Sequence, residues 1–244
     1  MTDNNNVWTG VRLDPLDVLF FRDGRPFDAA NRVTGGLPNP QTLAGALRTA
    51  LLANCGEFDF AKFARERKKP QGIQDALKNA GAPDWILKAK FRGPWLYDGR
   101  KDLTPELVLP VPAVLSLSTE EDKQWFRRRP LHNNAISRWN KISDEVALPC
   151  PLWSEDGERE ASAKAPGGFL TLSGIKKFLE GGKPDLEDHR KEEDLFGHDH
   201  RTGIVIDGET LTSVDGGIYG IQFLSLKKGV SIYAEICPGA GAPE

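Results

Sequence analysis

The segment from Pro38 to Leu52 constrains the fold more than any other, because it combines a helix start signal with an apolar stripe. Asn39 suits the N-cap position and Pro40 suits the first helical position. Leucines then recur at the i, i+4, i+8 spacing of one helix face, at Leu43, Leu47 and Leu51. The sequence therefore predicts a helix that ends near Gly56 and packs inward through these three leucines.

The other side of this helix is small and basic. It carries Gln41, Gly45, Arg48 and Thr49. A glycine inside a helix costs about 1 kcal/mol relative to alanine, so its presence beside an arginine needs a reason. We interpret this side as a docking face on which another backbone, of protein or of nucleic acid, approaches closely.

An apolar run precedes the helix and closes in the turn Arg22-Asp23-Gly24-Arg25. This turn, followed by the Pro38–Leu52 helix, resembles the RAMP family of the type III-B CRISPR (Cmr) effector complex whose members sit at the crRNA 5-prime end. In that family a "PLFFRDGRPF" element precedes a "P-x-TLAGALR" helix. The resemblance extends to the family's hairpin region through three later stretches, Arg201–Asp207, Gly217–Tyr219 and Val230–Ile236. Residues 54–164 match poorly.

The resemblance implies a noncatalytic RNA-binding subunit without a cofactor. Such a subunit would cap the crRNA 5-prime handle and contact the large polymerase-like Cmr subunit and the adjacent RAMP backbone subunits. Arginines and helix N-termini hold phosphates, and glycines allow a close approach of backbone. By resemblance, the RNA-binding residues are Arg22, Gly24, Arg25, Thr42, Gly45, Arg48 and Arg201. The alternative is that Arg22 and Arg25 are exposed turn residues paired with nearby aspartates, and that Arg48 is an ordinary surface charge.

Charge is the main argument against a nucleic-acid ligand, because the formal net charge is −3 and free-standing RNA binders are usually basic. Phosphate contacts need only a local basic stripe. Candidates for such a stripe are Arg22, Arg25, Arg32 and Arg48, together with Lys88, Lys90 and Arg92. An acidic total with a confined basic patch favours a subunit of an assembly.

The composition, with 39% hydrophobic and 27% charged residues, fits one elaborated domain or two small ones. No apolar run approaches the roughly 18 residues of a membrane helix, and the N-terminus has no signal-peptide pattern, so we expect a cytoplasmic protein. The three cysteines are far apart and outside any C-x-x-C spacing, which argues against disulfides and a zinc ribbon.

Strands and helices mix without regular alternation, so the fold class is expected to be α+β. The strand-loop-helix opening is typical of one half of a ferredoxin-like (RRM-like) RAMP fold. In the alternative arrangement, the chain contains two ferredoxin-like halves, of which the second is incomplete. We assign residues 1–237 to one RAMP domain with inserts at about 57–84 and 119–168. Residues 238–244 are expected to be a flexible or truncated tail, because family members usually continue beyond the last hairpin.

Four further elements are predicted from local pattern. They are a strand at Ile86–Tyr97, a short helix at Glu120–Arg129, a small amphipathic helix at Leu172–Glu180, and a hairpin turn at Lys227–Gly229. Two tryptophans, Trp95 and Trp139, are the favoured interface anchors.

Enzyme signatures are missing: there is no P-loop, no G-x-S-x-G elbow and no H-E-x-x-H motif. His198-Asp199-His200 is the one tempting metal or catalytic group, but the other ligands have no obvious source, so neither a metal nor a catalytic site is assigned. Two alternatives remain open. One is a crRNA-processing endoribonuclease that uses His132, His198 or His200, and the other is an adaptor that contacts only protein.

Overall fold

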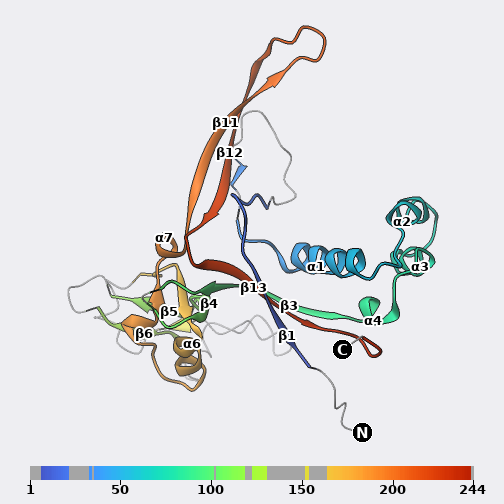
Figure 1. The fold of residues 1–244 in the computed structure, drawn as a ribbon. Coiled ribbons are helices and arrows are strands. Elements are labelled where there is room, and N and C mark those ends of the chain that lie inside the picture. The colour runs from blue at the N-terminus through green and yellow to red at the C-terminus, as the bar shows by residue number, and fades with distance from the viewer. Residues whose placement is uncertain are drawn as a thin grey trace, which may run out of the picture. The chain divides into compact units, whose positions relative to one another are not determined.

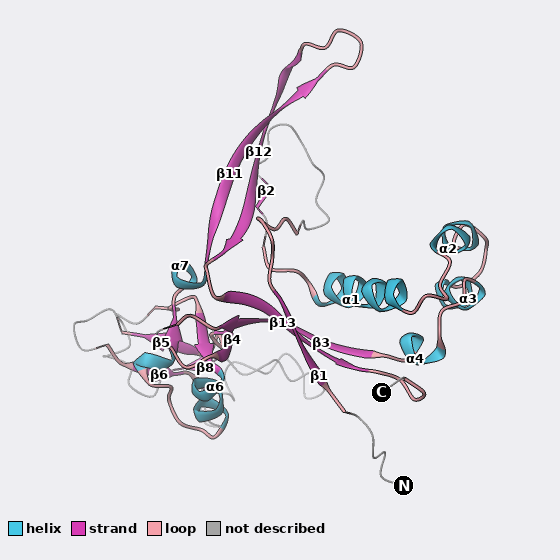
Figure 2. Ribbon diagram, in the orientation of Figure 1, coloured by secondary structure: helices cyan, strands magenta, loops and turns pink. Residues whose placement is uncertain are grey.

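The computed structural model describes residues 7–21, 33–34, 36–101, 103–118, 123–130, 152–153 and 164–242. Antiparallel strands and short helices make up these parts of the chain, which confirms the α+β class (Figures 1 and 2). The ferredoxin-like arrangement within that class stays a prediction. Contacts divide the chain into two compact units, Met1–Lys101 with Phe196–Glu244, and Asp102–Leu195.

Three neighbouring strands of an antiparallel sheet form the centre of the first unit. In spatial order they are β1 (Thr9–Leu13), β13 (Val230–Cys237) and β3 (Lys90–Asp98). Helix α1 (Pro40–Asn54) packs on one face of this sheet. Its Leu43 and Leu47 form a buried cluster with Ile232 and Ala234 of β13. The predicted helix is therefore confirmed, including its N-cap at Asn39.

Three short helices follow α1: α2 (Phe60–Glu66), α3 (Ile73–Asn79) and α4 (Asp84–Leu87). Residues of these helices pack against the end of α1, so the leucine that is buried there differs from the one predicted. Leu52 lies four residues after Arg48, on the outward side, yet it is buried with Leu77 and Ile86, whereas Leu51 is half-buried. The predicted stripe is incomplete in its last turn, because a second core covers the end of the helix and buries Leu52, while Leu51 packs against that core.

A long hairpin completes the first unit. Strand β11 (Phe196–Ile206) pairs antiparallel with β12 (Ser213–Leu226), and β2 (Val33–Thr34) pairs parallel with β12. The predicted turn at Lys227–Gly229 is present, with Gly229 at a φ of +88°. The predicted hairpin is wrong, because the two flanking strands join different sheets: β12 pairs with β11 and β2, and β13 pairs with β1 and β3.

The second unit contains small antiparallel groups: β4 (Glu106–Pro110) with β9 (Phe169–Thr171) and β10 (His189–Arg190), β5 (Leu115–Leu117) with β6 (Trp125–Arg127), and β7 (Arg129–Pro130) with β8 (Leu152–Trp153). Its helical segments are α6 (Leu172–Leu179), η2 (Leu186–Asp188) and α7 (Glu192–Leu195).

Two predictions change in these regions. The helix expected at Glu120–Arg129 is wrong over Trp125–Arg127, where Trp125 is buried with Leu115 and Leu170 and the backbone pairs as a strand. The strand expected from Ile86 begins only at Lys90, because Ile86 belongs to α4 and fills the core beneath α1. The Leu172–Glu180 helix is confirmed as α6.

Candidate nucleic-acid interface

The N-terminus of α1 begins the candidate interface. Asn39 caps the helix, and its Oδ1 accepts a hydrogen bond of 2.7 Å from the Thr42 backbone N–H. The first turn of the helix contains no acidic residue, so its positive dipole end is not neutralised by its own side chains. Thr42 is exposed. This end of the helix therefore suits an anionic ligand.

Gly45 and Arg48 lie further along the same helix. Gly45 is exposed, and a Cβ added there would meet nothing within 4 Å. The bare backbone is thus open to a close approach, as expected from the sequence. Arg48 is half-buried, and its guanidinium carbon lies 4.9 Å from the centre of the Phe91 ring on β3. This cation–π contact holds the arginine against the sheet, so it differs from a freely moving surface charge.

Arg22, Gly24 and Arg25 fall outside the described residues. The described residues on either side of 22–32 both lie along β12. Leu19 exchanges two backbone hydrogen bonds of 2.8 Å with Leu224, and Val33 of β2 pairs with Ile221. The chain therefore enters and leaves this segment beside the same strand.

Arg201 lies on β11, directly across from Ile221. Its side chain forms an ion pair of 2.8 Å with Asp199, and its guanidinium carbon lies 4.9 Å from the centre of the Phe223 ring. That ring in turn contacts Phe20, with 5.4 Å between ring centres. An aromatic link therefore joins Arg201 to the segment that runs into Arg22, although the two motifs lie near opposite ends of the sequence.

Phe20 and Phe223 were not predicted as site residues. Their signal in the sequence is only that of apolar positions in strands, and their relation appears once Leu19 pairs with Leu224. Arg48 belongs to the contact between α1 and β3, whereas Arg201 belongs to the hairpin.

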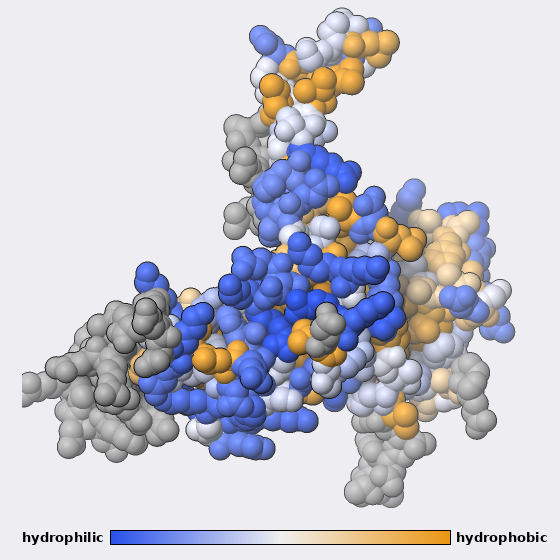
Figure 3. Space-filling view, turned by 60° about the vertical axis from the view of Figure 1, so that its left-hand side comes forward, coloured by the Kyte–Doolittle hydropathy of each residue, from blue (hydrophilic) through white to orange (hydrophobic). Residues whose placement is uncertain are grey.

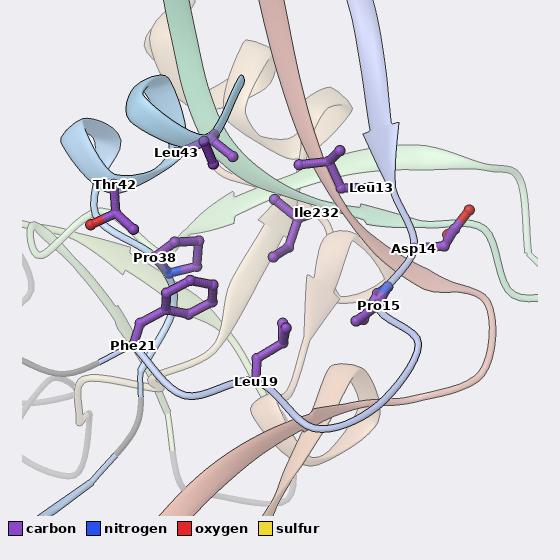
Figure 4. Close-up of a pocket in the computed structure, with 10 residues that line it drawn as sticks. Leu13, Asp14, Pro15, Leu19, Phe21, Pro38, Thr42, Leu43 and Ile232 are labelled. Carbon is purple, nitrogen blue, oxygen red and sulfur yellow. The ribbon is translucent and has the colours of Figure 1, made fainter. Parts of the chain in front are cut away.

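An apolar pocket of about 170 Å³ lies beside the start of α1 (Figure 4). Pro38, Thr42 and Phe21 line one part of it, and Leu13, Leu19 and Ile232 line another. Asp14 is at its edge, where a hydrogen bond from Ser231 lowers the pKa of the carboxyl below its usual value. The pocket therefore offers an apolar surface with one carboxylate at its edge.

His198, Asp199 and His200 are consecutive residues of β11. Because successive residues of a strand point to opposite faces, the two histidines share one face, and Asp199, on the other face, pairs with Arg201. Across the described ranges, no group of three or more His, Cys, Asp or Glu side chains is placed to hold a metal ion. His132 lies outside those ranges.

Comparison with known proteins then identifies the family. A family model described as CRISPR-associated protein (Cas_Cmr3) matches residues 11–244. The chain belongs to this family. The matched residues include both the turn-and-helix segment and the hairpin. The two regions that meet at β12 in this Cas_Cmr3 chain therefore both belong to the matched part of the sequence.

Solved structures give weaker likenesses to this Cas_Cmr3 chain. One is a chain of a type III-B Cmr-beta complex bound to cognate target RNA and AMPPnP, at 18% identity and a TM-score of 0.40, covering 96% of this chain and 55% of that chain. Another, from the complex bound to cognate target RNA, has 17% identity and a TM-score of 0.40, covering 93% and 54%. The chain thus spans about half the length of these subunits. No curated protein matches it. None of the described helices is long and apolar enough to cross a membrane.

Proposed function

We propose that this Cas_Cmr3 chain is a noncatalytic RNA-binding subunit of a type III-B CRISPR effector complex. In that role it caps the crRNA 5-prime handle and contacts the large polymerase-like subunit and the backbone subunits. Base pairing reads the target in RNA-guided systems while protein holds backbone and shape, so a subunit of this kind needs no catalytic residues.

One observation carries the proposal. The aromatic link from Arg201 through Phe223 to Phe20 places the hairpin motif beside the entry to the Arg22–Arg25 turn. The start of α1 follows closely, since the Gly36 N–H donates to the Phe21 carbonyl at 3.5 Å. Arginine, partly accessible aromatic rings and a helix N-terminus without acidic side chains are components that single-stranded RNA recognition uses.

The end of the hairpin supports membership of an assembly. Six aliphatic side chains are exposed there, and Figure 3 shows apolar residues gathered at this end: Ile204, Val205, Ile206, Leu211, Val214 and Ile218. Apolar residues on consecutive positions of both faces are unusual on a solvated hairpin and typical of a surface that another protein covers. We assign this end to contact with a neighbouring subunit.

The direct test measures handle RNA binding by the reconstituted complex over a range of salt concentrations. Arg201→Ala and Arg48→Ala are each expected to weaken binding and to reduce the salt slope by roughly one phosphate contact. Lys183→Ala is the matched control, because Lys183 is also an exposed cation over an aromatic ring, Phe126, but lies in the second unit. Unchanged affinity and an unchanged salt slope in both arginine variants would contradict RNA binding through these residues. The remaining function would then be that of an adaptor that contacts only protein.

A further inference from the structure

The central sheet of the first unit has a second face, opposite α1. Side chains alternate along β1 and β13, and Val11 and Ile232 pack with the α1 cluster. Arg12 and Tyr233 are therefore directed to the other face. Trp95 shares that face, because it lies directly across from Tyr233, beyond a register shift that separates it from Phe91 on β3. Tyr97 shares this face, two residues after Trp95.

The aromatic rings on this face lie along the sheet surface. Trp95 and Tyr233 have ring centres 6.2 Å apart and planes 32° apart. A Cβ added to Gly10 would lie 2.2 Å from the Tyr233 hydroxyl oxygen, so the tyrosine ring crosses β1 where glycine leaves room for it. Trp95, Tyr97 and Tyr233 are all half-buried, which leaves part of each ring accessible. Flat, partly exposed rings present π-faces to a planar ligand.

Two guanidinium groups extend this surface. The Arg92 guanidinium carbon lies 3.7 Å from the Trp8 ring centre, and that of Arg12 lies 5.7 Å from the Tyr97 ring centre. The side chains of Arg12 and Arg92 remain 56% and 55% exposed. A guanidinium plane stacked on a ring is itself a platform for a further planar group.

The charge of this face is slightly positive. Arg12 pairs with Asp14 at 3.1 Å, and Arg92 pairs with Glu235 at 3.7 Å. Lys90 is exposed at the start of β3, two residues before Arg92 and so on the same face. Three cations against two carboxylates leave one positive charge, in a chain whose formal net charge is −3. This favours an anionic ligand that is held mainly through its planar groups.

We propose that this face binds single-stranded RNA by stacking bases on Trp95, Tyr97 and Tyr233 and on the Arg12 and Arg92 guanidinium planes. This face is a second RNA contact, distinct from the region around Arg201. Its assignment rests on the proposed function only because that function makes RNA the ligand. Because both arginines are already paired with carboxylates, phosphate contacts contribute little here. Stacking on aromatics tolerates any base, so the face holds RNA without reading its sequence.

The test uses the purified full chain and a labelled oligouridine about 12 nucleotides long. Trp95→Leu and Tyr97→Leu keep an apolar side chain but remove the ring, so each is expected to weaken binding about five- to one-hundred-fold. Tyr97→Phe keeps the ring and is expected to bind as the unchanged chain does. The salt slope should stay the same in all three variants, because stacked bases release no counterions. Circular dichroism and thermal unfolding confirm that each variant is folded.

A second measurement needs no variant. Photocrosslinking of 4-thiouridine RNA to the unchanged chain, followed by mass spectrometry, is expected to label Trp95, Tyr97 or Tyr233. Unchanged affinity in both leucine variants, or crosslinks confined to other surfaces, would overturn the proposal. So would leucine variants that keep RNA binding but lose association with another Cmr subunit in an RNA-free mixture, since the face would then be a protein contact. Arg201→Ala separates the two RNA sites, because it should change the salt slope while the ring variants should not.

Discussion

Among single residues, arginines in the first unit are held by aromatic rings. Arg201 contacts Phe223, and Arg48 contacts Phe91. A ring contact limits the directions in which a guanidinium can point, so less conformational entropy is lost when a ligand binds. Gly45 complements them, because it leaves the helix backbone bare between Thr42 and Arg48.

Gly45→Ala should separate stability from binding. A Cβ meets open space in the free chain, so the substitution is expected to stabilise α1 by about 0.5–1 kcal/mol. The same methyl group is expected to weaken a ligand or subunit that approaches the backbone closely. Chemical denaturation and handle RNA binding measure the two effects.

Ala50→Gly is the matched control at an exposed position later in α1. It should lower stability by a similar amount and leave binding unchanged. Tighter or equal binding by Gly45→Ala would show that nothing approaches this backbone.

Among the structural elements, the β11–β12 hairpin has a tightly built turn with an apolar surface. Asp207 Oδ1 accepts hydrogen bonds from the backbone N–H groups of Thr210 and Glu209, at 2.8 and 3.0 Å. Leu211 follows with a φ of 54°, a left-handed conformation that is unfavourable for leucine, and its side chain is 78% exposed. A strained and exposed leucine is consistent with a surface that a partner covers.

The turn should weaken in acid. The backbone N–H groups of Thr210 and Glu209, together with the Thr210 hydroxyl, lower the pKa of Asp207 below its usual value near 4. Because the folded pKa is lowered, the carboxylate stabilises the turn above the unfolded pKa, and this contribution is lost as the pH falls through the folded pKa. An NMR titration of Asp207, with amide exchange at Thr210, measures both. A carboxyl that titrates at or above its usual value would contradict this account.

Leu211→Asn should weaken subunit association without unfolding the chain. Asparagine tolerates the left-handed conformation, so thermal stability is expected to be kept or slightly raised. Loss of the exposed leucine is expected to reduce co-purification with other Cmr subunits. Leu179→Asn is the control, because Leu179 is 73% exposed in the second unit. Equal loss in both variants would show a general solubility effect.

For the whole chain, the negative formal net charge and the localised arginines agree with a subunit that binds its ligand together with other proteins. The formal net charge of −3 opposes electrostatic RNA binding by the isolated chain, so RNA binding by that chain alone is expected to depend on base stacking. Specific binding is therefore expected to depend on the assembled complex.

The absence of catalysis is the remaining prediction. Purified chain incubated with repeat RNA is expected to leave the RNA intact, with or without EDTA. His198→Ala and His200→Ala should give the same result, because these exposed histidines are not expected to transfer protons to or from RNA. Specific cleavage that disappears in either variant would establish the endoribonuclease instead.

Several elements followed from local pattern. The Asn39 cap and the leucine spacing predicted α1, the amphipathic pattern of Leu172–Glu180 predicted α6, and Gly229 marked the turn before β13. Trp125–Arg127 shows where such reasoning fails. Its charged, helix-like neighbourhood predicted a helix, but pairing with β5 and burial beside Leu170 made it a strand.

The same division holds for the candidate interface. Residue types and spacing on the helix face predicted Gly45 and Arg48 as interface residues, because helix faces depend on neighbours within a few positions of the chain, and the family resemblance predicted Arg201. Pairing of Leu19 with Leu224, the Phe20–Phe223 contact and the burial of Leu52 depend on residues far away in the sequence. Local sequence signals do not encode such partners, so only the folded chain brings Arg201 beside the segment that leads into Arg22.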